Sequence, residues 1–313
     1  MSKWLTQIGA HSIDFSYLNK SILYKIYQRG QINFDSTKLY LLLGDIHGNI
    51  KAAIILAIRL QTLFSIPLCA IFQVGDFGFW PSGIAAKNED PYYKKDDSFD
   101  LFEMNQSLEH SQFFSVGAEK LEIMNAPFYF SRGNHEDFEQ LNLISKDKLT
   151  EVFRGIYFIP DYFKGMLEGL NVLVVGGILT DLKRGKGNKA KLEFKKAQQK
   201  LKTDIRRSNA QLLIQFDSTG VDLLITHSGL SSREHRDGSK QLETYLLHSN
   251  ICLHFYGHHH RFSLGNVGAN TLSIGLRNLD IDAKGMLRPG SFALIAWNDQ
   301  SNFEIYSDFA VIA

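Results

Sequence analysis

The amino-acid sequence predicts an α/β protein in which buried strands are covered by helices on both sides. Short, continuous apolar runs recur along the chain, and the first three lie at residues 39–43, 67–74 and 127–131. Residues 50–64, between the first two runs, carry apolar side chains at helical spacing. Continuous apolar runs that alternate with helices are typical of strands buried on both faces.

The later part of the chain repeats this pattern. Further apolar runs predict strands at 172–175, 221–226, 251–256, 291–297 and 303–306, and a helix is expected at 118–124. Residues 1–36 carry apolar side chains at helical spacing around 22–27, so we expect a helical N-terminal extension followed by a main domain at 37–313. The chain has six prolines and no Pro/Ser-rich linker, which favours one large domain with insertions at 81–116 and 183–207.

Composition places the chain among ordinary globular proteins. Of its 313 residues, 44% are hydrophobic and 21% charged, and 34 Lys and Arg against 33 Asp and Glu give a formal net charge of +1. These values exclude a disordered chain, a polybasic chromatin binder and an acidic solvating protein. Two cysteines, Cys69 and Cys252, cannot build a disulfide framework. The 11 histidines are more informative, because imidazole is the most frequent metal ligand.

The sequence also bears on location. No stretch approaches the ~20 consecutive apolar residues that a membrane-spanning helix needs. Residues 1–6 include one lysine but no apolar segment and no small-residue cleavage site, so we expect no secretory signal. The expectation is a cytoplasmic protein without membrane contact; the sequence indicates no oligomeric state.

The insertion at 183–207 is strongly basic. It holds 11 Lys and Arg against Glu193 and Asp204. Its apolar residues recur at helical spacing, at Ala190, Phe194, Ala197, Leu201 and Ile205. The pattern predicts a helix with a basic outer face, which is either a solvated surface or an electrostatic guide for a polyanionic substrate such as a nucleotide or nucleic acid.

Polar residues follow five of the apolar runs directly, generally beside a glycine that permits a tight turn. The five segments read Gly44-Asp45-Ile46-His47-Gly48-Asn49, Gly75-Asp76, Gly133-Asn134-His135-Glu136, Thr226-His227 and Gly257-His258-His259-His260. Because ligands bind beyond the carboxyl ends of strands in open α/β sheets, we expect these side chains to converge.

The residue types in these segments suit a binuclear metal site with oxygen and nitrogen ligands. Asp45 and His47 lie two residues apart, so a turning backbone can direct both at one ion, and His258 and His260 repeat this spacing. A carboxylate such as Asp76 can bridge two cations. A ligand set without thiolate suits Mn, Fe, Zn, Co or Ni, and we favour Mn.

In this order, the five segments resemble the calcineurin-like metallophosphoesterase superfamily, over residues 39–275. The resemblance implies a double β-sandwich flanked by helices rather than one doubly wound sheet. It implies Asp45, His47 and His260 as ligands of one metal, Asn134, His227 and His258 as ligands of the other, and Asp76 as the bridge. It also implies that His135 contacts the scissile phosphate and protonates the leaving group, whereas His259 falls at a variable position.

The implied chemistry is hydrolysis of a phosphate ester. Two cations ~3.5–4 Å apart lower the pKa of a bridging water and neutralise the phosphate oxygens. A bridging hydroxide can then attack phosphorus in line, and an imidazolium such as that of His135 can protonate the departing alcohol.

The sequence departs from the protein Ser/Thr phosphatase branch of this superfamily at one place. That branch has Asp-Arg-Gly three residues after the bridging Asp, where this chain has Phe79, Trp80 and Pro81. Another cation must therefore hold the phosphate, and the candidates are Arg132, Arg184, Arg233 and Arg236. Phe77, Phe79 and Trp80 either pack at the edge of the core or offer a platform to a base.

Several functions remain open at this point. The first is a dinuclear metal-dependent phosphoesterase with a slight preference for a nucleotide or nucleic-acid phosphodiester. Alternatives are a phosphomonoesterase such as a Ser/Thr protein phosphatase, a non-catalytic scaffold of the same fold, and a nucleic-acid-binding module led by the basic helix. Non-catalytic scaffolds of this fold usually lack some of the metal ligands, whereas all seven implied ligands are present in this sequence.

Overall fold

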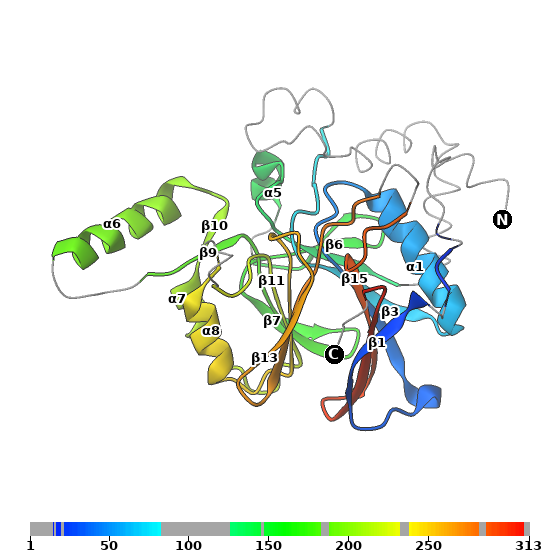
Figure 1. The fold of residues 1–313 in the computed structure, drawn as a ribbon. Helices are drawn as coiled ribbons and strands as arrows, with labels where there is room; N and C mark the ends of the chain where they lie inside the picture. The colour runs from blue at the N-terminus through cyan, green and yellow to red at the C-terminus, as the bar shows by residue number, and fades with distance from the viewer. Residues whose placement is uncertain are drawn as a thin grey trace.

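The computed structural model describes residues 15, 17–19, 22–82, 126–144, 147–182, 188–231, 238–281 and 286–309. Within these residues, two β-sheets pack against each other, and helices lie outside them (Figure 1). The mixed α/β prediction is confirmed, and so is the double β-sandwich flanked by helices.

The first sheet has eight strands. In spatial order they are β1 (Tyr24–Arg29), β16 (Asn302–Ser307), β15 (Phe292–Asp299), β2 (Lys38–Leu43), β3 (Leu68–Gln73), β4 (Phe128–Ser131), β6 (Ile156–Ile159) and β5 (Thr150–Phe153). Strands β2, β3, β4 and β6 run parallel to one another. The carboxyl ends of these four strands therefore lie along the same edge of the sheet.

The second sheet has six strands. Their order is β13 (Ser263–Val267), β14 (Thr271–Gly275), β12 (Leu253–Tyr256), β11 (Leu223–Thr226), β8 (Leu170–Val175) and β7 (Phe163–Leu167). Strands β8, β11, β12 and β14 are parallel. A separate parallel pair consists of β9 (Ile178–Thr180) and β10 (Arg207–Asn209).

Five α-helices and one 3-10 helix accompany the sheets in the described part of the chain. They are η2 (Phe34–Ser36), α1 (Ile50–Phe64), α5 (Phe138–Leu143), α6 (Asn188–Thr203), α7 (Ala210–Leu213) and α8 (Lys240–Leu247). Helix α1 buries Ala53, Leu56 and Leu60 on one face, at the spacing of an amphipathic helix, and Ser65, which caps its carboxyl end, has the left-handed conformation. None of these described helices is long and apolar enough to cross a membrane.

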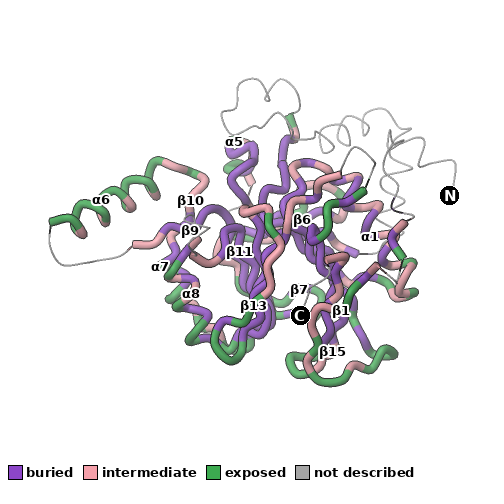
Figure 2. Tube along the Cα trace, viewed as in Figure 1, coloured by how far each residue is buried: buried purple, intermediate pink, exposed green. Residues whose placement is uncertain are grey.

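Alternation of side chains along the strands produces three apolar layers. In β2, Leu41 packs in one cluster with Leu56 of α1, whereas its neighbour Leu42 packs in a second cluster with Phe255 of the opposite sheet. A third cluster covers the outer face of the second sheet, where Leu224 of β11 and Leu246 of α8 lie together. Both sheets are thus buried on both faces in their central strands (Figure 2).

The predicted N-terminal helix is wrong for residues 24–29, which form strand β1. This segment pairs antiparallel with β16, from Tyr24 opposite Ser307 to Arg29 opposite Phe303. The edge of the first sheet offers main-chain hydrogen-bond partners to this segment. In so short a segment, pairing with these partners outweighs the helical spacing of its apolar residues. Residues 1–14, 83–116 and 118–124, for which an extension, an insertion and a helix were predicted, lie outside the described residues, and the domain boundaries stay a prediction.

The basic insertion contains the predicted helix. Helix α6 spans Asn188–Thr203, and none of its residues is buried. The stripe residues within α6, Ala190, Phe194, Ala197 and Leu201, are half-buried, and the other residues of the helix are exposed (Figure 2). Ile205, the last residue of the predicted stripe, lies beyond the helix and is exposed. Residues 183–187 lie outside the described part of the chain.

Candidate metal centre

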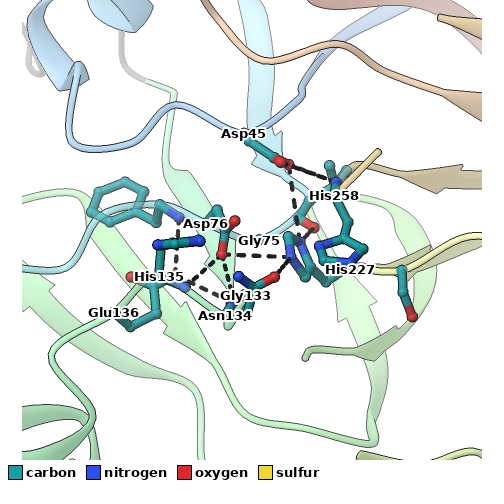
Figure 3. A network of polar contacts seen from close by, with 12 residues as sticks. Asp45, Gly75, Asp76, Gly133, Asn134, His135, Glu136, His227 and His258 are labelled. Atoms are coloured by element: carbon teal, nitrogen blue, oxygen red, sulfur yellow. Dashed lines mark hydrogen bonds and ion pairs between the residues drawn. The ribbon is translucent and has the colours of Figure 1, made fainter. Parts of the chain in front are cut away.

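The seven predicted ligands follow the carboxyl ends of five parallel strands, namely β2, β3 and β4 of the first sheet and β11 and β12 of the second. Figure 3 shows residues from all five strand ends directed toward one another. Two groups of side chains have candidate ligand atoms within 4.8 Å of one another. The groups are Asp45, His47, Asp76 and His260, and Asp76, His227 and His258. Asp76 is common to both groups.

Asp45 links the two sheets. Its Oδ2 lies 2.9 Å from Nε2 of His260, and its carboxylate also accepts the backbone N–H of His258, at 3.0 Å to Oδ2. His47 approaches the same group, with its Nε2 3.4 Å from Nε2 of His260. Asp45 is completely buried. Burial raises the pKa of Asp45, but the hydrogen bond from His260 and the attraction of the His227, His260 and His47 rings in their protonated form outweigh it, so the net shift is downward.

Asp76 is held from two directions. Its Oδ1 accepts the backbone N–H groups of Asn134 and His135, the latter at 2.7 Å. Its backbone carbonyl accepts the N–H groups of Ile46 and His47, at 3.1 and 3.0 Å. Burial, and next the negative charge of Asp45, raise the pKa of Asp76. Two buried carboxylates in one site repel each other, which a cation between them would relieve.

The hydrogen bond of His227 favours the tautomer that leaves its Nε2 available to bind a metal ion. Its Nδ1 lies 3.2 Å from the carbonyl of Val74, which can only accept, so Nδ1 carries the proton and Nε2 presents a lone pair. Nε2 lies 2.9 Å from Oδ1 of Asn134 and 3.5 Å from Oδ1 of Asp76. Burial lowers the pKa of His227 to about 4, so the ring is neutral at pH 7. Three acceptor atoms therefore face one another, an arrangement that fits a cation.

Backbone conformation sets these residues apart. Seven non-glycine residues of the described chain have positive φ, and four of them are predicted ligands: His47 (46°), Asp76 (53°), His258 (63°) and His260 (50°). Such conformations cost of order 1–3 kcal/mol each, persist only where the surroundings enforce them, and cluster at functional sites. The turns after β2, β3 and β12 thus maintain unfavourable backbone angles that direct side chains into the site.

Two motif glycines are required for space rather than for a tight turn. A Cβ on Gly133 would lie 2.1 Å from Oδ1 of Asp76, and one on Gly257 would lie 2.0 Å from Oδ1 of Asp45. Neither glycine has a positive φ. Their missing side chains let the backbone of one loop contact the carboxylate of another.

Glu136 is a residue whose role the sequence alone did not reveal. Its buried carboxylate accepts the backbone N–H groups of Phe77 (2.9 Å), Phe79 (2.7 Å) and Gly133 (3.2 Å). It therefore joins the loop after β3 to the loop after β4. Burial, and next the charge of Asp76, raise the pKa of Glu136 to about 8. A signal was present in the sequence, since an acidic residue directly follows His135.

Phe79 and Trp80, which replace the Asp-Arg pair, pack into the core together with the nearby Phe77. Phe77 and Trp80 are completely buried and Phe79 is 5% exposed. Phe77 stacks on Phe130 with ring centroids 4.1 Å apart. Of the two interpretations left open, the structure therefore supports packing rather than a platform for a base.

Arg132, one predicted phosphate ligand, has extensive protein contacts. Its Nε donates to Oδ2 of Asp161 at 3.2 Å, and its terminal nitrogens donate to Oγ of Ser208 and the carbonyl of Ile205. These contacts anchor it beside β10, and binding of phosphate by Arg132 stays a prediction. Arg184, Arg233 and Arg236 lie outside the described residues.

His135 lies beside the first group of ligands. Its ring centroid is 5.4 Å from that of His47, in an edge-on arrangement, and it is 8% exposed. His259 belongs to neither group; its ring lies against Tyr256 and His258.

Several solved structures are similar to this chain over most of its length. A dimetal phosphatase from Danio rerio is 9% identical, with a TM-score of 0.49 over 87% of this chain and 99% of that one. TT1561 of Thermus thermophilus is 13% identical, with a TM-score of 0.43 over 87% and 100%. A 5′-nucleotidase from Candida albicans is 14% identical, with a TM-score of 0.37 over 90% and 52%. No curated protein sequence matches significantly.

The sequence model of one protein family matches residues 38–262, a span that contains all seven predicted ligands and His135. It is described as calcineurin-like phosphoesterase. Because this match covers well over half of the 313 residues, the chain belongs to the calcineurin-like phosphoesterase family.

Proposed function

We propose that this protein is a dinuclear metal-dependent phosphoesterase whose centre is the group of ligands around Asp76. The observation that carries the proposal is that Asp76 is shared by two clusters of candidate ligands. Asp45, His47 and His260 would complete one site, and Asn134, His227 and His258 the other. The donor set is nitrogen and oxygen without thiolate, which favours Mn and also suits Fe, Zn, Co or Ni.

The residues around the ligands prepare the site before any ion binds. The carbonyl of Val74 fixes the His227 tautomer, and the backbone N–H groups of Asn134 and His135 orient the Asp76 carboxylate. Two bound divalent ions would supply positive charge for the phosphate oxygens and acidify a water molecule.

His135 would act as the general acid. Its backbone N–H is anchored on Asp76, which sets the position of its imidazole at the edge of the ligand group. From there an imidazole N–H can donate its proton to the leaving oxygen as the ester bond breaks. The Asp-Arg pair of protein phosphatases is absent, so the imidazole and phosphate depend on other contacts.

The preferred substrate class is a nucleotide or nucleic-acid phosphodiester. The exposed, lysine-rich helix α6 supports this preference, because its charge would attract a polyanion. A phosphomonoesterase such as a Ser/Thr protein phosphatase is the alternative, and the likeness of residues 44–48 and 132–136 to that branch supports it.

Three substrates separate these possibilities. The purified protein with Mn²⁺ should hydrolyse bis-p-nitrophenyl phosphate with a higher kcat/KM than p-nitrophenyl phosphate, and it should also cleave single-stranded DNA. Faster hydrolysis of the monoester without nuclease activity would favour the phosphomonoesterase. Absence of all three activities across Mn, Fe, Zn, Co and Ni, with far less than stoichiometric metal, would favour a scaffold.

A further inference from the structure

A cavity of about 430 Å³ lies between helix α6 and the body of the protein. Its lining comes from β9, α6, β10, the segment after β11 and the start of α8. None of the predicted metal ligands lines it. The volume is within the range of small-molecule sites, which is roughly 300–1,000 Å³.

Cations from three separate elements converge on this cavity. Lys196 and Lys200 project from α6, Arg207 from β10 and Lys240 from the first turn of α8. Arg207 is held in place, with its Nε 3.1 Å from Oδ2 of Asp204 and its Nη1 donating to Oγ1 of Thr180. Four cations from three elements line a single concave site, which is the pattern expected for an anion-binding cavity.

The carboxylates at the cavity offset this charge only in part, because two of them, Asp181 and Glu193, line it against four cations. Asp181 accepts the hydroxyl of Ser239 and the backbone N–H groups of Lys240 and Gln241, so it is directed at the amino end of α8. Glu193 is the other acidic residue in the lining. Asp204 lies between two guanidinium groups, because Arg206 contacts it as well as Arg207.

Strand β9 connects the cavity to the candidate metal centre. Gly177, just before β9, donates its N–H to the carbonyl of Arg132, two residues before Asn134. Within β9, Leu179 donates its N–H at 2.8 Å to Oγ of Ser228, the residue after His227. The strand ends at Thr180 in the cavity wall, and its three residues span on the order of 10 Å.

We propose that this cavity binds a non-scissile phosphate of a single-stranded oligonucleotide whose scissile phosphate lies at the metal centre. The inference rests on the proposed function and specifies its substrate class. A cavity of this size accepts one nucleotide-sized group and not a duplex, and lysine and arginine are the residues that track a nucleic-acid backbone. The cavity, rather than the exposed surface of α6 as a whole, provides the contact.

Helix α6 offers a matched control. Glu193, Lys196, Ala197 and Lys200 line the cavity and are spaced as one helical face. All four of these lysines are exposed, but Lys191 and Lys195 point roughly the opposite way by the same helical spacing. The double variants Lys196→Gln/Lys200→Gln and Lys191→Gln/Lys195→Gln remove equal charge from the same helix.

The test is fluorescence anisotropy of labelled oligothymidylate titrated with the full-length protein in EDTA, where hydrolysis does not consume the probe. We expect Lys196→Gln/Lys200→Gln to raise Kd roughly 5- to 10-fold, as loss of two surface charge contacts would. The plot of log K against log salt for this variant should become shallower by about 0.7, the value for the loss of one phosphate contact on a single strand. Lys191→Gln/Lys195→Gln should stay within about two-fold of wild type, since neither lysine lines the cavity. If both double variants bound the oligonucleotide more weakly to the same extent, or if neither bound it more weakly than wild type, the proposal would be overturned.

A kinetic readout separates this proposal from the proposed function. With Mn²⁺, Lys196→Gln/Lys200→Gln should raise KM for the oligonucleotide but not KM for bis-p-nitrophenyl phosphate, which has one phosphate. If no ester is hydrolysed, the proposed function fails while the anisotropy titration still decides the cavity. If hydrolysis occurs and both pairs bind oligothymidylate alike, only the cavity proposal fails.

Discussion

Gly133→Ala should damage the metal centre although it adds a single methyl group outside the ligand set. The new Cβ would lie 2.0 Å from the backbone nitrogen of Asp76 and 2.1 Å from its Oδ1, whereas ordinary van der Waals contact begins at 3.4 Å. One partner must therefore move by more than about 1 Å. Asp76 cannot move freely, because its backbone carbonyl accepts the N–H groups of Ile46 and His47.

The expected magnitudes follow from this displacement. A shift of about 1 Å at a catalytic group costs about 10²-fold in rate, and overpacking costs roughly 1–3 kcal/mol of stability. The control is Gly265→Ala, because a Cβ there has nothing within 4 Å and the residue lies in the partly exposed strand β13. The measurements are kcat/KM for bis-p-nitrophenyl phosphate with Mn²⁺, bound metal by plasma mass spectrometry, and the thermal unfolding midpoint.

The reasoning would be refuted if Gly133→Ala retained the metal content of Gly265→Ala and a rate within about two-fold of it. A loss of rate and metal that leaves the unfolding midpoint within a few degrees would support a local displacement of Asp76. It would also distinguish the effect from general unfolding.

Three further predictions concern residues near the site and within the second sheet. His135→Asn should keep its metal and lose about 10²- to 10⁴-fold in turnover, and a proportional loss of metal would contradict its role as an acid. Glu136→Ala leaves three buried backbone N–H groups without their acceptor and should cost roughly 3–6 kcal/mol in urea unfolding; a cost below about 1 kcal/mol would contradict this role. Burial lowers the pKa of His254 from 6.5 to about 3, so below pH 6.5 the unfolded chain binds a proton that the folded chain does not. As the pH falls between those values, the free energy of unfolding of the wild type should decrease by about 1.4 kcal/mol per pH unit relative to that of His254→Gln. Urea unfolding measured across this pH range checks this, and parallel stability profiles of the two proteins would contradict it.

The central elements of the fold could be predicted from the sequence because their burial is simple to recognise. The run at 39–43 became β2 (Lys38–Leu43), and the helix predicted at 50–64 has those bounds as α1. Both faces of these central strands are covered, so their sequences are continuously apolar. Strands with mixed polarity were missed or misassigned. Strand β1, for example, has a largely exposed pattern, and its structure depends on its partner β16.

That the candidate ligands lie close together could be predicted for the same reason, since each follows a recognisable strand, and their binding of metal stays a prediction. The supporting contacts could not be predicted. The Glu136 carboxylate accepts three backbone N–H groups, two of which belong to a loop distant in sequence. The close approach of Gly257 to Asp45 also joins distant segments. Such contacts depend on the register of one loop against another. The cavity beside α6 is likewise formed by residues from several elements, so no local sequence pattern predicts it.

The most direct test of the account is calorimetric titration of Mn²⁺ into the metal-stripped, full-length protein and its Asp76→Asn variant. Because Asp76 belongs to both ligand groups, the wild type should bind two equivalents, and the variant should bind both more weakly. Asp217→Asn changes an exposed carboxylate in the loop before β11 that belongs to neither ligand group and accepts hydrogen bonds from Thr219, so this variant should bind as the wild type does. Fewer than two equivalents in the wild type, or two equivalents of unchanged affinity in Asp76→Asn, would contradict the shared dinuclear centre.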